Sequence, residues 1–191
     1  MKKESKGIYS GCWRYLKESR KYFLFVSIVF LLSVFLGFLF PVFFVDIIRE
    51  FIEEILAKTE GMSFFQLFLF ILQNNIITAF SGFILGIFLG VFPLVLTFLN
   101  GYVLGFVANL SVGSAGFTSL WSLFPHGIFE LPALIISLGL GLKMASFIFA
   151  KNKEKKFMYD LKNSLRVFLF IIVPLLIIAG LIETGLIVLL S

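Results

Sequence analysis

The sequence contains few of the side chains that enzymes use for chemistry. It has one cysteine and one histidine, and charged residues make up only 14% of its 191 positions. Cys12 can form no internal disulfide, because it has no second cysteine to pair with. The sequence shows neither a glycine-rich phosphate loop nor paired carboxylates in a recognisable cleft. We therefore predict that the protein is not an enzyme and has no metal site and no cofactor.

Apolar residues are abundant instead. They make up 60% of the chain, which includes 27 phenylalanines. A soluble protein of this length has too little interior to hide so much apolar surface, whereas lipid can solvate it. A spanning helix needs about 20 mostly apolar residues. The composition thus predicts an all-α, polytopic transmembrane helix bundle of about five spans, with residues 1–191 forming a single membrane domain.

The charged residues are grouped along the chain. Basic residues gather before residue 22 and again between residues 151 and 166, whereas residues 46–60 are mainly acidic. Both basic groups flank long apolar runs, so the excess of Lys and Arg in cytoplasmic loops explains them without nucleic acid as a partner. This pattern predicts a multi-pass protein of the plasma membrane with its N-terminus in the cytoplasm.

Hydropathy and turn signals divide the chain into segments. The predicted elements are an amphipathic cytoplasmic helix at 8–21, surface helices within 46–73, and spans at 22–45, 75–98, 102–122, 127–149 and 165–189. A solvated basic tail is the alternative for 8–21. Asn100 and Gly101 indicate a turn. Glycines near residue 115 weaken the third span, so a re-entrant or broken segment near 110–132 is also considered.

Glycines recur at a spacing of four residues. Gly82, Gly86 and Gly90 would form a smooth ridge on one helix, and Gly101 and Gly105 repeat the spacing. Such ridges let another helix backbone approach closely. They favour packing within one chain over a dimer interface or a moving seam.

The segment FPHGIFELPALI, residues 124–135, concentrates the polar signals. His126 and Glu130 are four residues apart and would share a helix face. Pro125 suits the first turn of a helix, whereas Pro132 predicts a kink. Three interpretations stay open for His126 and Glu130: a structural anchor bonded to backbone, a substrate or proton site, and a metal site, for which two ligands are a weak signal.

Other polar residues interrupt the apolar runs. Ionised groups inside a membrane usually face the protein interior or water and find partners. Glu183 is expected near the outer interface, and Lys143 is expected to snorkel toward the cytoplasm. Asn74, Asn75, Asn100 and Asn109 are candidates for bonds between helices.

These motifs resemble a known family. The runs NNIITAFSGFILGIFLG, NGYVLG and PHGIFELPALIISLGLGL resemble the stage II sporulation protein M family of integral membrane proteins, over roughly residues 20–190. Members occur in archaea as well as bacteria, so the resemblance does not imply sporulation here. The positions that match are Asn75, Gly82, Gly86, Asn100, Gly101, His126, Gly127, Glu130 and Pro132.

The resemblance implies an anchor or scaffold, because the namesake helps to recruit peptidoglycan-degrading partners to the septal membrane. We therefore expect a non-enzymatic membrane scaffold, homo-oligomeric (a homodimer in the simplest case), in contact with membrane lipid and a membrane or cell-envelope protein. The alternative is a transporter or channel component for a small molecule, lipid or ion, which would use His126 and Glu130. Broken helices at transporter sites resemble the proline-kinked segment.

Chemical labelling tests the predicted threading of the chain. Residues near position 1 and near position 155 are expected on the same side of the membrane, because both basic groups would stay in the cytoplasm. A membrane-impermeant reagent applied to intact cells should modify neither segment, and should modify both after lysis. Labelling of one segment alone in intact cells would refute the topology.

Overall fold

The computed structural model describes residues 7–190, without the side chains of residues 121–126 and 190, and this range consists of helices joined by short connections. The helices are α1 (Ile8–Leu39), α2 (Val45–Thr59), α3 (Phe64–Ile84), α4 (Val91–Ala115), α5 (Leu120–Ala145), α6 (Lys153–Val167) and α7 (Val173–Leu190). A π-helical segment, Phe168–Ile172, joins α6 to α7 without a break. Five helical stretches of the described chain are long and apolar enough to cross a membrane, which confirms the predicted fold class.

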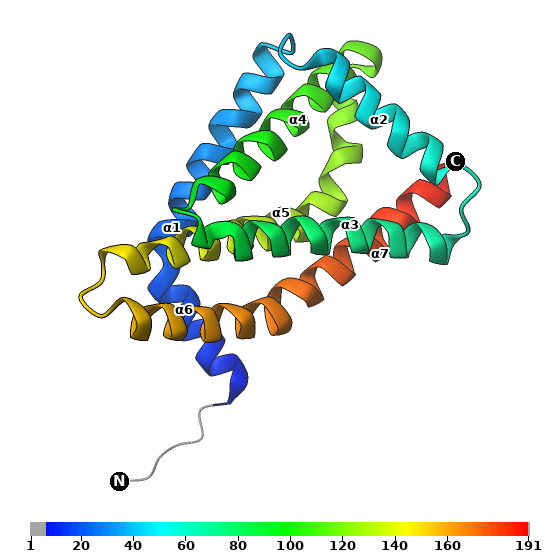
Figure 1. Cartoon of the computed structure of the whole chain (residues 1–191). Coiled ribbons are helices and arrows are strands. Elements are labelled where there is room, and N and C mark those ends of the chain that lie inside the picture. Colours follow the sequence, from blue (N-terminus) through cyan, green and yellow to red (C-terminus); the bar gives the residue numbers. More distant parts are fainter. Residues whose placement is uncertain (1–6, 191) are drawn as a thin grey trace.

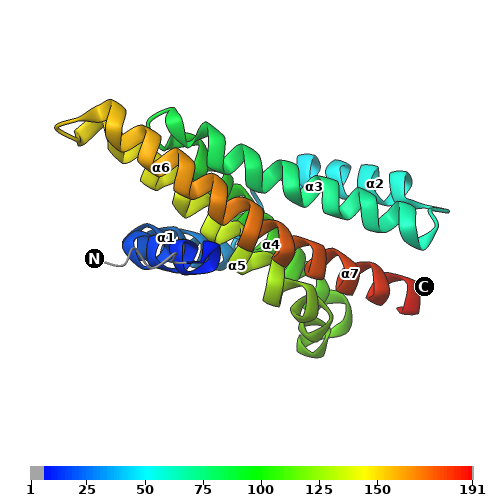
Figure 2. The ribbon, with the colours of Figure 1, turned by 90° about the horizontal axis from the view of Figure 1, so that it is seen from below.

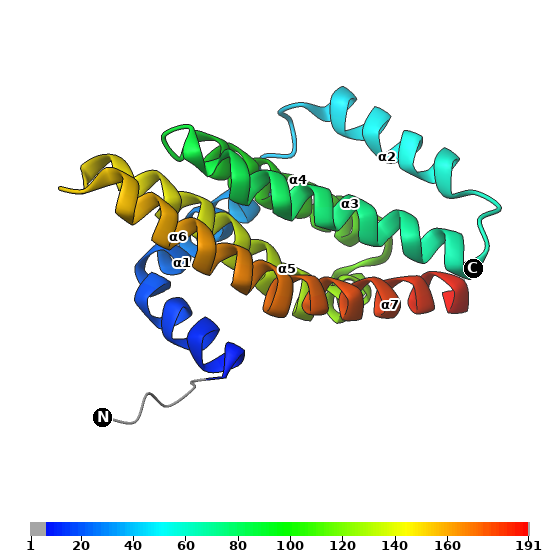
Figure 3. The same cartoon turned by 60° about the horizontal axis from the view of Figure 1, so that its bottom comes forward.

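The helices form an open, three-sided arrangement (Figure 1). α1 and α4 pair along one side, α2 forms the second, and α3 and part of α5 lie along the third. The continuous α6–α7 helix runs the length of the molecule between α1 and α3 (Figure 2). The α3–α4 turn and the α5–α6 connection lie at one end of the bundle, and the C-terminus lies at the other (Figure 3).

Large apolar side chains cover the outside of the bundle. Leu24 and Phe35 on α1 expose 65% and 63% of their surface, and Leu169 exposes 60%. Exposed apolar surface on this scale is rare on soluble monomers. In a membrane this surface contacts the lipid tails.

Glycines allow α1 and α4 to pack backbone against backbone. A side chain on Gly101 or Gly105 would collide with the main chain of α1 near Phe30 and Val34, and one on Gly37 would meet the carbonyl of Tyr102. The small residues of both helices therefore face each other. Because the two backbones are close, many atoms make dispersion contacts that stabilise the pair.

A second glycine contact joins α3 to α5. Gly86 lies against the backbone of Gly141, Gly141 lies against the carbonyl of Gly82, and Gly82 lies against the side chain of Leu138. Gly90 has a different role, because its φ of 73° places it in the left-handed region at the start of α4. The glycines at 82, 86, 101 and 105 are thus occupied by contacts within the chain.

The predicted boundary between an amphipathic helix at 8–21 and a span at 22–45 is wrong. α1 is one continuous helix from Ile8 to Leu39. The face that carries Cys12, Tyr15 and Ser19 is buried against protein, chiefly α6, rather than against lipid headgroups. The polar contacts of Tyr15 and Ser19, described below, hold this part of the helix in place.

The chain has no break before residue 75 or at Asn100–Gly101, so the predicted spans 75–98 and 102–122 begin later than the helices do. α3 starts at Ser63, whose hydroxyl and the side chain of Gln66 cap each other's backbone, and it continues to Ile84. The turn to α4 falls at Leu89 and Gly90, which both have positive φ. Asn100 lies within α4, and its side-chain amide donates to the Leu96 carbonyl at 2.8 Å.

Some of the remaining boundaries also differ. The basic stretch predicted as a loop before a span at 165–189 is mostly helix, because the Asn152 side chain caps α6 by accepting from the Lys155 backbone N–H at 3.1 Å. The fourth span matches the prediction of 127–149: the apolar stretch runs Gly127–Phe149, and its helix begins earlier, at Leu120. The predicted surface helix after residue 45 is α2, whereas residues 64–73 belong to the spanning helix α3.

Substituting one glycine of α4 tests the close approach to α1. Gly105→Ala should lower the free energy of unfolding in detergent by about 1–3 kcal/mol, because the new Cβ would press on the backbone at Val34 and Phe38. Gly113→Ala is the matched control in the same helix, since nothing lies within 4 Å of its added Cβ. Equal stability of the two variants would contradict this packing.

Candidate functional site

A cavity of about 590 Å³ lies inside the bundle. Helices α1 to α5 and α7 all contribute to its wall, which is mostly apolar. Cavities of this size commonly hold small molecules, oriented by a few polar groups on an apolar surface. The polar side chains of the described wall are Asn74, Asn75, Thr78, Asn100 and Glu130.

Three of the residues predicted from the sequence meet at this cavity. Asn75 comes from α3, Asn100 from α4 and Glu130 from α5. Asn75 lies near the middle of its span and Asn100 is the tenth of the 25 residues of α4, whereas Glu130 lies near the start of the span Gly127–Phe149. The two asparagines are therefore toward the middle of their spans, and Glu130 is near one end of its own.

Glu130 is the one charged residue among the described residues of the cavity wall. It is partly buried, and the described side chains form no ion pair with it. The carboxylate of Glu183, on α7, repels the Glu130 carboxylate electrostatically. A carboxylate beside amide and hydroxyl groups can accept hydrogen bonds from a cation or a neutral donor.

Glu130 and Pro132 both lie within the single helix α5. The short turn predicted after Pro125 is absent, because α5 runs from Leu120 to Ala145. Figure 1 shows α5 changing direction between its first turns and the part that lies along α3. Pro132 lacks an N–H for the Ile128 carbonyl, which accounts for a bend at this level. The side chain of His126 lies outside the described residues, so its approach to Glu130 stays a prediction.

α2 covers the cavity with apolar side chains. Phe51 and Ile55 belong to the cavity wall, whereas acidic residues occupy other positions of this helix. Ile48 packs against Tyr102 and Phe106 of α4. The Tyr102 hydroxyl also donates to the Phe40 carbonyl at 2.7 Å and so ties α4 to the connection that leads into α2.

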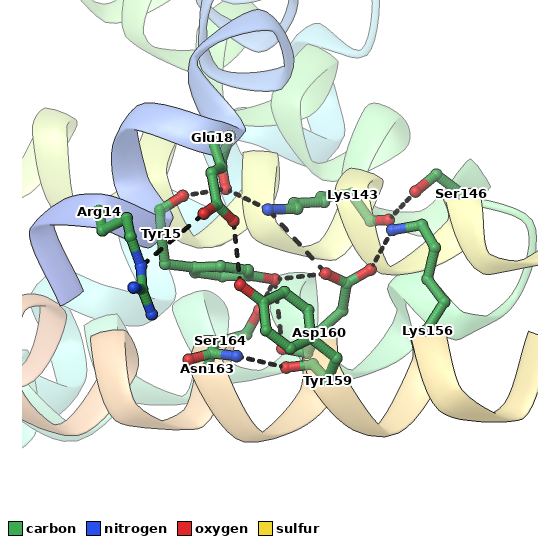
Figure 4. Close-up of polar contacts among 11 residues, drawn as sticks. Arg14, Tyr15, Glu18, Lys143, Ser146, Lys156, Tyr159, Asp160, Asn163 and Ser164 are labelled. Atoms are coloured by element: carbon green, nitrogen blue, oxygen red, sulfur yellow. Dashed lines mark hydrogen bonds and ion pairs between the residues drawn. The ribbon is translucent and has the colours of Figure 1, made fainter. Parts of the chain in front are cut away.

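A buried polar cluster joins α1, α5 and α6 at the end of the bundle that carries the α5–α6 connection (Figure 4). We call it the polar clamp; its members are Tyr15, Ser19, Lys143, Lys156, Asp160 and Ser164. Asp160 is 1% exposed. It accepts the Tyr15 hydroxyl at 3.0 Å and pairs with the Lys156 ammonium.

Lys143 is the second cation of the clamp. Its ammonium donates to the Ser19 hydroxyl at 2.9 Å and lies 3.9 Å from the Asp160 carboxylate. It also lies 3.6 Å from the centre of the Tyr15 ring, a geometry in which the ring face attracts a cation. These partners compensate the loss of water around buried charges, so the clamp fixes α1 against α5 and α6.

The expectation that Lys143 snorkels toward water is wrong, because the residue is 6% exposed and bonded inside the protein. Sequence reasoning also missed Tyr15 and Asp160. A signal was present: Tyr15 and Ser19 are four residues apart, and so are Lys156, Asp160 and Ser164, which places polar groups on one face of each helix. The pairing of those faces depends on the fold.

The clamp also brings the two basic segments of the sequence together. Tyr159 on α6 donates its hydroxyl to Glu18 on α1 at 3.1 Å, next to Arg14. The chain segments around residues 15 and 160 therefore lie at the same end of the bundle. This arrangement agrees with the prediction that both segments lie on one side of the membrane.

The long apolar helices, which enclose a cavity with a few polar groups, define a polytopic α-helical integral membrane protein. The chain belongs to the stage II sporulation protein M family, whose model matches residues 23–186 and so includes the described cavity wall. An uncharacterized protein of Methanocaldococcus jannaschii is 32% identical over 181 residues, covering 87% of this chain and 81% of its own length. No solved structure matches the chain with significance.

Removing the charge of Asp160 tests the polar clamp. Asp160→Asn should lower the free energy of unfolding in detergent by about 3–5 kcal/mol, because Lys143 loses the carboxylate that compensates its buried charge. Glu54→Gln is the matched control, since it breaks an exposed Glu–Lys pair on α2 that is worth at most about 0.5 kcal/mol. A loss at Asp160 no larger than that of the control would show that the clamp is not a structural link.

Proposed function

We propose that the protein binds a small cationic solute in the cavity and moves it through the membrane, as a transporter or as a component of one. The observation that carries this proposal is the meeting of Asn75, Asn100 and Glu130, from three helices, in one cavity. Transporter sites typically lie near the bilayer midplane and are formed by interrupted or bent helices. The protein is then a carrier rather than an enzyme.

The chemistry of the cavity favours a cation. Glu130 supplies a negative charge that the described ion pairs do not compensate, and the amide oxygens of Asn75 and Asn100 can add neutral ligands. Phe30 and Phe51 in the same wall offer aromatic surface, which suits an organic ammonium group. An apolar wall around a single carboxylate strengthens this attraction, because little water screens it.

α2 is placed to control access to the cavity. Its apolar residues Phe51 and Ile55 lie in the cavity wall, so movement of this helix would open the cavity from that direction. Phe44 and Gly61, at its two ends, have φ values of 58° and 73°, which mark abrupt changes of chain direction. We infer that α2 faces the extracytoplasmic side of the plasma membrane, with the N-terminus in the cytoplasm.

A scaffold that organises envelope proteins is the second candidate, and the family relationship favours it. In this function the protein would act as a homo-oligomer or bind a membrane partner. The glycines that suggested a dimer contact are occupied within the chain, so a partner would use other helix faces. The cavity has no evident role in a scaffold, which is why transport is the leading proposal.

Neutralising Glu130 tests the proposed transport. Protein reconstituted in liposomes should carry at least one cation of a panel that contains Na⁺, K⁺, methylammonium and choline. Glu130→Gln should reduce that flux at least about tenfold, because a neutral amide removes the charge that attracts the cation. Flux would be followed with ion-sensitive dyes or radiolabelled solute.

The matched control is Glu53→Gln, the same chemical change on the exposed surface of α2. It should leave the flux within about twofold of the unsubstituted protein, since an exposed and screened charge contributes little. Transport is refuted if no cation of the panel crosses, or if the two variants lose flux equally.

A further inference from the structure

An open cleft of about 430 Å³ lies beside the polar clamp, between α1, α5 and α6. Its described wall consists of Glu18, Lys143, Asn152, Lys155, Lys156, Tyr159 and Asp160. The cleft is separate from the Glu130 cavity: no residue belongs to both walls. It combines three ammonium groups with an amide and a phenol, all of which can donate hydrogen bonds.

The charges around this cleft leave a positive excess. Lys143 and Lys156 share the single carboxylate of Asp160, so one of their two charges has no counterion within the clamp. Glu18 faces the cleft too, but Arg14 lies 3.9 Å from its carboxylate. Lys155 adds a further charge, and the described ion pairs do not include it.

The α6 terminus adds to this field. α6 begins at the cleft with Asn152 as its cap, and the backbone N–H groups of its first turn point toward this end. The N-terminus of a helix carries a partial positive charge that favours anions. The lysines and the helix end therefore act in the same direction, and Glu154 in the first turn of α6 offsets part of this charge.

Exposed aromatic side chains at this end of the bundle favour a position of the cleft at the membrane surface. Phe149, in the α5–α6 connection, exposes 91% of its surface, and Trp13 on α1 exposes 61%. Tyr9 exposes 68% on the same helix. Tyr and Trp side chains are typically enriched where the hydrocarbon region meets the headgroups. A ligand in the cleft would thus lie at the depth of lipid phosphates.

We infer that this cleft binds the phosphate group of an anionic membrane lipid. The ammonium groups of Lys155 and Lys156 and the side chain of Asn152 bind the phosphate oxygens, and the acyl chains lie along the exposed apolar side chains near Phe149. Basic pockets between helices at the cytoplasmic face bind anionic headgroups in this way. The bound lipid completes the charge balance of the clamp, so it stabilises the contact between α1 and α6.

Lipid titration of the full-length protein in a neutral detergent tests this inference. Dioleoyl phosphatidylglycerol should raise the unfolding temperature, whereas dioleoyl phosphatidylcholine, with the same acyl chains, should not. Native mass spectrometry should detect the bound phosphatidylglycerol. Lys155→Ala should weaken its binding about fivefold, the effect of one basic residue near an anionic lipid. Without lipid, the variant should have the same unfolding temperature as the unsubstituted protein, because Lys155 is exposed.

Lys153→Ala is the matched control: it removes the same charge from the first turn of α6, but Lys153 is not part of the cleft wall. Its phosphatidylglycerol affinity should stay within about twofold of the unsubstituted protein. Equal losses in the two variants would show general surface attraction and overturn the site. Equal stabilisation by phosphatidylcholine, or by inorganic phosphate at the same concentration, would overturn binding of an anionic lipid.

Discussion

Polar groups in a bilayer have no water to bind, and this constraint governs the structure at every level. Backbone N–H and C=O groups must be satisfied within the chain, so the spans are long helices. α1 and the continuous α6–α7 helix are the clearest cases. Once the backbone is satisfied, the outer faces can be almost wholly apolar, and the polar side chains turn inward.

Those inward polar groups lie in two places with different physical character. The clamp around Asp160 pairs its charges closely and joins three helices, so its energetic role is structural. The Glu130 cavity has space around its polar groups, and its amides and carboxylate come from three different helices. A closely bonded cluster favours one conformation, whereas a cavity with a few polar groups on an apolar wall is available for a ligand.

Glycine contacts between helices hold the cavity and the clamp in separate places. Between α1 and α4, and between α3 and α5, the missing side chains let backbones approach closely. Such contacts replace the hydrophobic driving force that helix association lacks in lipid. Because α3, α4 and α5 are fixed by these contacts, Asn75, Asn100 and Glu130 are held around a common space. α2 lies over that space without a glycine contact of its own, which fits a mobile cover.

The amino-acid sequence by itself determined the medium, the helical class, the count of about five spans and the family, because apolar run length and charge grouping are local properties. It also pointed to Asn75, Asn100 and Glu130, since polar residues are costly in lipid. It misplaced several boundaries: Asn75 and Asn100 resembled breaks, yet within the fold they are helical residues that face the cavity. Only the tertiary structure decided that these three side chains converge, and that Tyr15 and Asp160 meet across 145 positions. The partner of a polar side chain is set by the packing of whole helices, which sequence spacing does not encode.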